Sequence, residues 1–492
     1  MTSAQTWLDM AINLYDENIA EPVFWLGDDC HREKAKKHFR DCYVSVMNDI
    51  VHYPWRLENN QYNSEFSDFF LSENYIRCKD ACIKMMDRLD HIGMFNRLDR
   101  EMYLKIISHW ALKKVSELKP DALIVAEAPH SHAQYLIYEI FLYLDIPVVQ
   151  FLSWSIQPVV MLQQVKENKL IPVEKTFSIS EWKEINIKIE NYIKKVSNSD
   201  NYQNFIPTSI GPQRRNSSSK LKRLSRFFSR RKLRELAAEE YRNRKFKWKK
   251  EFLPVNPQFI GVLISEWIRK DKGKNVLKAF HKNIDTCDLS QDYVYVGLHY
   301  EPERSTNPDG GPFHDQILAI VKLRKILPPN VEIYVKEHPS QFYIHKGPRG
   351  RSPLFYDAIR RIKGVRLIDI TIENLSLIRN AKIVCTITGT IGLEAAALGK
   401  KTLHFGNSWY QGMPNTIRWY DGITYEEIMN LPNASPDDVS RHLIEYKATY
   451  GVPCFRNESG VGYVSAHNKS PEFAAAEVKG TAHLAKQFFK KI

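Results

Sequence analysis

Four polar segments of the sequence each follow an apolar, strand-like run, and they hold the residues that could carry chemistry. The first is Lys336-Glu337-His338-Pro339. Pro339 lacks an N–H group, so it ends the strand and biases His338 towards extended backbone. A cation, a carboxylate and an imidazole within one turn could bind the phosphate and ribose of a nucleotide. An ordinary polar turn at a strand end is the alternative.

The second segment is the loop TITGTIGLE at 386–394, which is rich in small and hydroxylic residues. Thr386, Thr388 and Thr390 supply hydroxyl groups, and Gly389 allows close approach of the backbone to a ligand. A helix that begins at about residue 391 presents free N–H groups to an anion. Glu394, one turn along, could meet ribose hydroxyls. A plain helix capped by Thr390 is the alternative. Phosphate binding is favoured because the loop holds more small and hydroxylic residues than a helix cap needs.

This loop does not fit two common nucleotide motifs. It lacks GxxxxGK[ST], which argues against a P-loop ATPase site. It also lacks GxGxxG, which argues against a dinucleotide site.

Two further strand ends carry acids and histidines. His299 and Glu301 lie in GLHYEPE at 297–303, before a Gly/Pro loop. They either face a ligand or stabilise the helix expected at about residue 314. Glu127 and His130 lie in EAPH at 127–130. This is where a general base or an acceptor-binding group is expected. For His132, a place on the helix face is favoured over a catalytic role.

An aromatic loop at 409–420 could stack on a base or a sugar. Ordinary packing of the loop is slightly favoured.

The elements that position these residues alternate between strand and helix. In the first half, a strand at 121–126, a helix at 131–144 and a strand at 146–151 form a βαβ unit. In the second half, strands are expected at 292–297, 331–336, 365–368, 381–387 and 401–405, with helices at 314–327, 353–362, 372–380 and 391–398. The polar loops lie at the carboxyl ends of strands, where open α/β sheets bind ligands.

We therefore predict an α/β protein with two Rossmann-like domains facing each other across a cleft. The predicted boundaries are 1–210 for the first domain, 211–251 for a basic interdomain segment, 252–446 for the second domain and 447–492 for a C-terminal helical tail.

The net charge of +13 comes from a small part of the 492 residues. Residues 211–250 hold 16 Lys/Arg and 3 Asp/Glu, which leaves 54 basic and 54 acidic groups elsewhere. This distribution argues against a broad nucleic-acid-binding surface. Leu221, Leu224 and Phe228 have helical spacing among the basic residues, which favours contact with an anionic membrane surface. A solvated linker is the alternative.

The remaining composition is typical of an intracellular globular protein. The seven cysteines include no CxxC pair, which favours reduced thiols and argues against a structural zinc site. The N-terminus has no signal-peptide pattern. The longest apolar stretch, 135–154, contains Glu139, Asp145 and Pro147, so no membrane span is expected. We expect a cytoplasmic protein, peripheral on the inner membrane if the basic segment binds lipid.

Several of these segments resemble the bacterial capsule polysaccharide biosynthesis family. The resemblance rests on LHYEPE (298–303), DGGPFHDQ (309–316), YVKEHP (334–339), TITGTIGLEAAALGKKTLHFG (386–406) and WY (409–410), and more weakly on EAPH (127–130). Characterised members of this family are GT-B glycosyltransferases. They include enzymes that transfer 3-deoxy-manno-octulosonic acid (Kdo) from CMP-Kdo.

The resemblance implies roles for individual residues. His338 would contact the phosphate or ribose of CMP. From their places at strand ends, and not from the resemblance, Lys336, Glu337, His299, Glu301 and His130 are also expected to bind substrate. The three threonines and Gly389 would hold phosphate, with Glu394 near the ribose. Glu127 would be the general base. The first domain would bind the acceptor and the second the nucleotide sugar.

We therefore expect a glycosyltransferase that inverts the anomeric centre and uses neither a cofactor nor a metal. Its partners would be a nucleotide sugar, with CMP-Kdo as one candidate, and a glycan or lipid-linked acceptor; no nucleic acid is expected. The sequence contains no DxD pair placed for metal-dependent transfer. A nucleotide-sugar 2-epimerase and a non-catalytic polysaccharide-binding or export component are the alternatives.

Overall fold

The computed structural model describes residues 5–52, 57, 64–90, 96–174, 177–198, 259–343, 347–454 and 470–491. The basic segment at 211–251 lies outside these residues, so its contact with a membrane stays a prediction. Among the described helices, none has both the length and the apolar character needed to cross a membrane.

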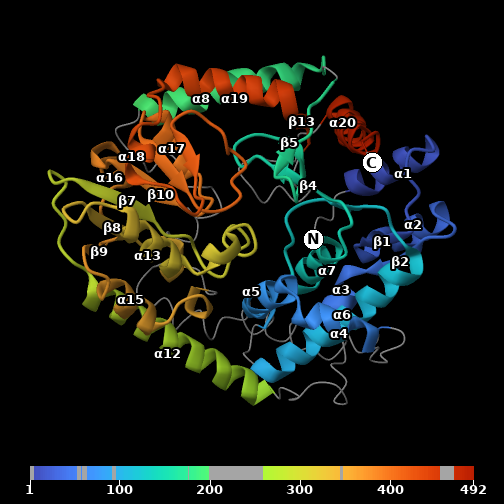
Figure 1. Ribbon diagram of the computed structural model, residues 1–492, viewed down its shortest axis with the longest axis horizontal. Coiled ribbons are helices and arrows are strands. Elements are labelled where there is room, and N and C mark those ends of the chain that lie inside the picture. The colour runs from blue at the N-terminus through green and yellow to red at the C-terminus, as the bar shows by residue number, and fades with distance from the viewer. Residues whose placement is uncertain are drawn as a thin grey trace, which may run out of the picture.

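The second half of the chain forms a six-stranded parallel sheet with helices on both faces (Figure 1). Its strands are β7 (Tyr293–Gly297), β8 (Glu332–Lys336), β9 (Val365–Ile368), β10 (Ile383–Thr386), β11 (Lys401–His404) and β12 (Thr416–Arg418). The spatial order is β12-β11-β10-β7-β8-β9, which is the doubly wound Rossmann order. The five predicted strands are confirmed, and β12 is an additional strand within the aromatic loop.

Buried apolar side chains cover both faces of this sheet, and one face includes three buried tyrosines. One face packs on α12 (Phe259–Asn283), α13 (Gln316–Ile326), α15 (Pro353–Arg360) and α18 (Tyr425–Met429). The other packs on α16 (Asn374–Asn380) and α17 (Ile391–Ala397). A strand buried on both faces reads as a continuous apolar run, which is why these strands were recognisable from the sequence.

The first half forms a mixed sheet. β3 (Leu123–Val125) and β4 (Val148–Ser153) are parallel and joined by α7 (His132–Tyr143), which confirms the predicted βαβ unit. β5 (Val159–Gln164) and β6 (Lys169–Leu170) add antiparallel strands. β1 (Phe24–Gly27) and β2 (Tyr43–Val46) form a separate parallel pair.

Helices surround these sheets. They are α1 (Gln5–Asp16), α2 (Arg32–His38), α3 (Met47–His52), α4 (Ser67–Leu71), α5 (Glu73–Leu89), α6 (Arg97–Leu118) and α8 (Ser180–Asn198). The main apolar core of this half lies between α5, α6 and α7.

The end of the chain returns to the first domain (Figure 1). α19 (Pro436–Tyr450) packs on α8, and β13 (Val452–Pro453) pairs with β5. α20 (Pro471–Phe489) packs on α1, where Thr6 donates to Glu477. The predicted helical tail is therefore part of the N-terminal domain in space.

An apolar cluster joins the two domains. It includes Trp154 from β4's end and Trp409 from the aromatic loop, whose rings stack with centroids 4.8 Å apart. Trp409 also donates to the Ser155 hydroxyl at 3.0 Å. The aromatic loop therefore packs between the domains, as favoured from its composition. The predicted fold class, two Rossmann-like α/β domains in a GT-B-like arrangement, is confirmed.

Candidate active site

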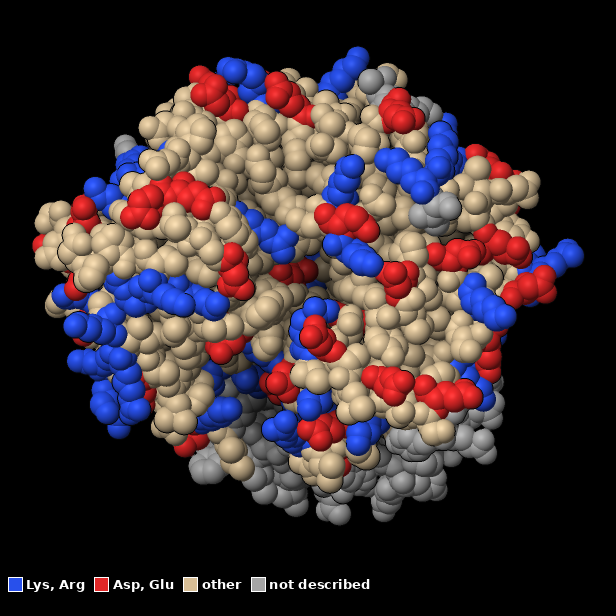
Figure 2. Space-filling model, viewed as in Figure 1, with Lys and Arg blue, Asp and Glu red and all other residues tan. Residues whose placement is uncertain are grey.

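The candidate site lies where the strand order of the second sheet reverses. β7 and β10 are neighbours there, and the chain leaves them towards helices on opposite faces. Ligands of open α/β sheets bind at such a point, outside the carboxyl ends of the strands. The loops after β7 and β10 carry His299 and the Thr/Gly loop (386–390), so two predicted segments meet. Figure 2 shows acidic and basic side chains around the hollow at the centre of this face.

The buried His299 ring holds the Thr/Gly loop in place. Its Nε2 accepts from the Thr388 amide at 3.2 Å and lies 3.0 Å from the Thr386 hydroxyl. The Thr386 oxygen in turn accepts from the Gly389 amide at 3.1 Å. Because Nε2 is an acceptor, the ring proton lies on Nδ1, which is 3.3 Å from the Ser305 hydroxyl. Burial lowers the pKa of His299 to about 4, so the ring is neutral at physiological pH.

The two loops are tied together a second time. The Thr388 hydroxyl donates to the Ser305 carbonyl at 2.5 Å. Behind the loop, the buried Tyr410 hydroxyl donates to the Gly389 carbonyl at 2.6 Å. The Thr/Gly loop is therefore held from both sides. The Thr390 hydroxyl makes no capping hydrogen bond to α17, so the capped-helix alternative does not account for it.

Gly389 is expected to be essential for the shape of this loop. An added Cβ would lie 2.8 Å from the Thr386 Oγ1 and 3.3 Å from the His299 Nε2. Gly389→Ala should therefore displace the loop and lower nucleotide affinity about tenfold or more, as measured by calorimetry. Gly412→Ala is the matched control, because a Cβ there meets nothing within 4 Å. It should keep the wild-type affinity, although its positive φ of 81° makes it strained. Unchanged affinity in Gly389→Ala would exclude this loop as the nucleotide site.

Glu337 and Lys336 were predicted to bind substrate, but their side chains make internal contacts. Glu337 forms a two-point ion pair with Arg351, at 2.7 and 3.2 Å, and accepts from Tyr356 at 2.9 Å. Lys336 donates to the Ile372 carbonyl and to Asn374 at the start of α16. These contacts anchor β8 within the domain.

Glu301 is also buried, at 1% exposure. Its carboxylate accepts from Gln316 at 3.1 Å and lies 3.4 Å from Lys84 of α5 in the other domain. Burial acts to raise the pKa of Glu301, but Lys84 and Arg351 outweigh it and lower the pKa. Glu301 therefore links the domains as an ionised carboxylate.

His338 and Glu394 are better placed for a ligand than the residues beside them. His338 is half-buried, and its Nδ1 accepts from the Ser340 amide at 3.2 Å. A neutral ring then carries its proton on Nε2, which makes that nitrogen a donor. Glu394 lies on the first turn of α17 at 5% exposure, directly after the Thr/Gly loop.

Glu127 and His130 reach the site from the N-terminal domain. Glu127 Oε2 lies 3.7 Å from an Arg304 nitrogen, and Arg304 belongs to the loop after β7. Part of the His130 residue is exposed to solvent, but desolvation of the imidazole by the surrounding protein, with smaller effects of Arg304 and Arg88, lowers its pKa to about 3. The structure therefore brings the predicted base into contact with the loop that follows β7.

The C-terminal half of α5 fixes this arrangement. Arg88 donates to the His130 carbonyl at 3.2 Å and to the Asn307 carbonyl across the domain boundary. Asn307 donates back to the Ala81 carbonyl at 2.9 Å. Arg349 donates to the Asp87 carbonyl at 2.9 Å. One helix of the first domain thus docks on two loops of the second.

Comparison with known proteins finds a family match for the segment that forms much of this site. Residues 308–427 match the family model described as capsule polysaccharide biosynthesis protein. The predicted resemblance to this family is confirmed. The matched segment contains His338, the Thr/Gly loop and Glu394. His299, Glu301 and the residues of the first domain lie outside it.

The solved structures that match this chain include two Kdo transferases and an epimerase. One, a Thermosulfurimonas dismutans KpsC β-Kdo 2,4 transferase, is 13% identical, with 65% of this chain and 77% of that chain covered and a TM-score of 0.25. A KpsC β-Kdo 2,7 transferase from the same organism is 12% identical, with 76% and 97% covered and a TM-score of 0.25. A Methanocaldococcus jannaschii UDP-GlcNAc 2-epimerase in complex with UDP-GlcNAc and UDP is 14% identical, with 73% and 83% covered and a TM-score of 0.21. Comparison with curated proteins finds no match.

Sequence reasoning missed three arginines of the site. Arg304 immediately follows the EPE run, in the same loop as the candidate residues His299 and Glu301, so the sequence could have indicated that it lies near the site. Arg351 and Arg88 had no such signal, because Arg351 lies in a Gly/Pro loop and Arg88 near the end of an ordinary helix. Their partners are distant in sequence and meet only in the folded chain.

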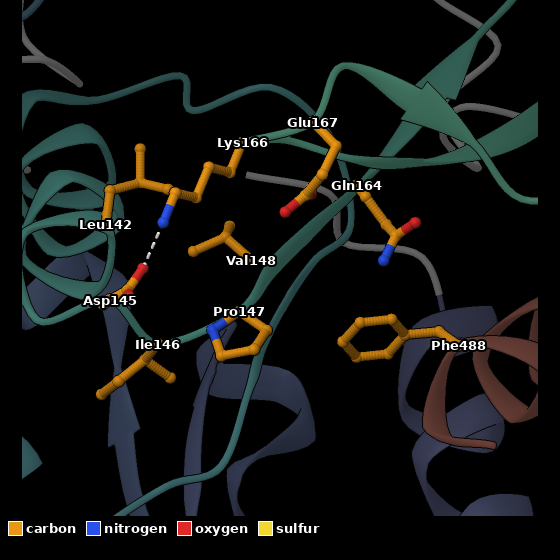
Figure 3. Close-up of a pocket in the computed structure, with 9 residues that line it drawn as sticks. All are labelled: Leu142, Asp145, Ile146, Pro147, Val148, Gln164, Lys166, Glu167 and Phe488. Atoms are coloured by element: carbon orange, nitrogen blue, oxygen red, sulfur yellow. Dashed lines mark hydrogen bonds and ion pairs between the residues drawn. The ribbon is translucent and has the colours of Figure 1, made fainter. Parts of the chain in front are cut away.

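A cavity of about 160 Å³ lies at the other end of the first sheet (Figure 3). Pro147 and Val148 line it where β4 begins, with Phe488 of α20 on one side. Lys166 and Asp145 form an ion pair at its rim, 2.5 Å apart. The cavity lies at the start of β4, whereas Glu127 and His130 follow the end of the parallel strand β3, so the cavity is separate from the candidate site.

Proposed function

We propose that the protein is a glycosyltransferase of capsular or other surface polysaccharide synthesis. The proposal rests on one observation: the segment that matches the capsule family contains His338 and forms the Thr/Gly loop at the strand-order reversal of a Rossmann-type sheet. The donor would be a nucleotide sugar, and CMP-Kdo is the first to test. The acceptor would be a glycan or a lipid-linked glycan.

The donor would bind mainly to the second domain. The phosphate would lie against the exposed part of the loop at 388–390, with the N–H groups there as donors. His338 would donate from Nε2 to a phosphate or ribose oxygen. Glu394 would accept from ribose hydroxyls. Lys336, Glu337, His299 and Glu301 would support these groups from behind through the internal contacts described above.

The transfer would use Glu127 as the general base. Its carboxylate takes the proton of the acceptor hydroxyl, whose oxygen forms a bond to the anomeric carbon. The bond from that carbon to the phosphate oxygen breaks, and the nucleotide leaves with the bonding electrons. Direct displacement inverts the anomeric centre. Closure of the domains over the site would limit hydrolysis.

A nucleotide panel tests this proposal. The thermal unfolding temperature is measured with CMP, UDP, GMP and no nucleotide, because a ligand that binds only the folded state stabilises it. We expect protection by CMP at 100 times its dissociation constant to reach about 2.7 kcal/mol. CMP-Kdo is then incubated with a capsular acceptor, and CMP release is measured.

The other outcomes of the panel separate the alternatives. Protection by UDP alone would favour the epimerase or another transferase. Protection by none of the nucleotides would favour a non-catalytic polysaccharide-binding or export component, and would contradict the proposal.

A further inference from the structure

Lys84 of α5 carries a positive charge from the first domain into the second. Its Nζ lies 3.4 Å from Glu301 Oε1 and donates to the His314 carbonyl at 2.5 Å. Glu301 follows β7, and His314 ends the short helix η5 (Gly311–His314) that precedes α13. Lys84 therefore holds two segments of the second domain at once.

The two members of this ion pair differ in burial. The Glu301 side chain is 1% exposed, whereas that of Lys84 is 29% exposed. Among the described residues, no other cation lies within ion-pair distance of Glu301, since the nearby Arg351 is paired with Glu337. A buried carboxylate without its cation is strongly unfavourable, while a partly exposed lysine can be solvated. Loss of Lys84 would therefore disturb Glu301 more than loss of the carboxylate would disturb Lys84.

A continuous series of hydrogen bonds runs from Glu301 to the Thr/Gly loop. Gln316 of α13 donates to the same Glu301 oxygen at 3.1 Å and accepts from the His299 amide at 2.8 Å. The His299 ring accepts from the Thr388 amide at 3.2 Å. We call Glu301, Gln316 and His299 the relay, because they connect Lys84 in one domain with the Thr/Gly loop in the other.

Lys84 also supports the helix that carries Gln316. His314, whose carbonyl accepts from Lys84, lies two residues before Gln316 and next to the N-cap of α13. Removal of Lys84 would therefore loosen both partners of the hydrogen bond between Gln316 and Glu301.

We propose that Lys84 is a positioning residue that couples docking of the two domains to the shape of the nucleotide-binding loop. The inference rests on the proposed function, because it takes the Thr/Gly loop as the phosphate site. With the domains docked, Lys84 compensates the charge of Glu301. The compensated carboxylate holds Gln316 and, through it, His299, whose ring orients the Thr388 amide. Coupling between two sites is reciprocal, so a nucleotide on this loop also favours the docked domains.

Hydrogen exchange of the nucleotide-free protein tests the relay. In Lys84→Met, the peptide that contains the Thr388 and Gly389 amides should exchange about fivefold faster or more, which is the lower end of typical coupling between sites. Lys84→Arg should exchange at nearly the wild-type rate, because it keeps the charge. Lys114→Met is the matched control. Lys114 pairs with Glu117 within α6 at 3.0 Å, so its loss should leave the loop unchanged.

Calorimetry with CMP tests the consequence for binding. Lys84→Met should weaken CMP binding about fivefold or more, although Lys84 is not among the proposed contacts of the nucleotide. Glu301→Gln should weaken it less, because the remaining Lys84 can be solvated. Combining Lys84→Met with Glu301→Gln should restore most of the affinity and most of the slow exchange. A neutral amide needs no cation, and its oxygen can still accept from Gln316.

Two outcomes would overturn this inference. One is a wild-type rate of loop exchange, or a wild-type CMP affinity, in Lys84→Met, which a purely structural ion pair predicts even where the variant is less stable. The other is a loss in Lys84→Met that Glu301→Gln does not relieve, since the relay runs through that carboxylate. Circular dichroism checks that each variant is folded.

Failure of the relay and failure of the proposed function are distinguishable. If the wild-type chain binds CMP and either outcome is obtained, only the role of Lys84 fails. If the wild-type chain binds neither CMP nor UDP, the proposed function fails. The exchange experiment uses no nucleotide, so it then still decides whether Lys84 positions the loop.

Discussion

Glu127→Gln is expected to lower kcat about 10²- to 10⁴-fold, which is the usual contribution of a general base. Glutamine keeps the size of the side chain but cannot take a proton from the acceptor hydroxyl. The residue lies at the carboxyl end of β3, next to the guanidinium of Arg304 at 3.7 Å. The donor is the nucleotide sugar of whichever nucleotide stabilises the protein in the thermal unfolding panel. The measurement is the release of that nucleotide from the donor, in the presence and absence of acceptor.

The control for Glu127 comes from the same domain. Glu101 pairs with Arg97 on α6 at 3.0 Å, and Glu101→Gln should retain wild-type turnover. Nucleotide binding should persist in Glu127→Gln, which separates loss of chemistry from loss of the fold. Near-normal turnover in this variant would assign the base to another residue of the site.

Glu337→Ala is expected to destabilise the protein by about 3–5 kcal/mol, because it leaves the buried Arg351 without its carboxylate partner. The two side chains are 0% and 2% exposed, and their nitrogen and oxygen atoms lie 2.7 Å apart. Tyr356 loses its acceptor in the same variant. The measurement is the urea concentration at the midpoint of unfolding, followed by the fluorescence of the buried tryptophans.

A second, more exposed ion pair of the same domain serves as the control for the buried Glu337–Arg351 pair. Glu332 and Arg366 are also 2.7 Å apart, but their side chains are 22% and 39% exposed. Glu332→Ala should therefore lower the free energy of unfolding by less than about 1 kcal/mol. Combining Glu337→Met with Arg351→Met should recover much of the loss, because apolar side chains need no buried partner. An equal decrease in the free energy of unfolding for Glu337→Ala and Glu332→Ala would show that burial does not set the strength of these ion pairs.

The sequence predicted the parallel strands of the second domain well, for a physical reason. Strands buried on both faces are apolar throughout, and their ends are marked by polar loops. The antiparallel β5 was missed because its apolar run follows β4 without a helix between them. β12 was missed because a strand of three residues inside an aromatic loop has no pattern of its own.

The candidate site was predicted in part. The sequence indicated which loops carry chemistry, since each follows a strand. It did not indicate which side chains of a loop turn inward. Lys336 and Glu337 adjoin His338 in the chain, yet both are held by internal partners. Those partners, Asn374 and Arg351, lie on other loops, so no local pattern could reveal them.

The sequence by itself determined the fold class, the family resemblance and the set of loops at the strand ends, because these depend on periodicity and on short local motifs. Only the tertiary structure decided which strands are neighbours, and therefore that His299 and Thr386 lie 3.0 Å apart. It also decided that Arg304 meets Glu127 across the domain boundary. Contacts between loops far apart in the chain depend on strand order and domain packing, which no local pattern encodes.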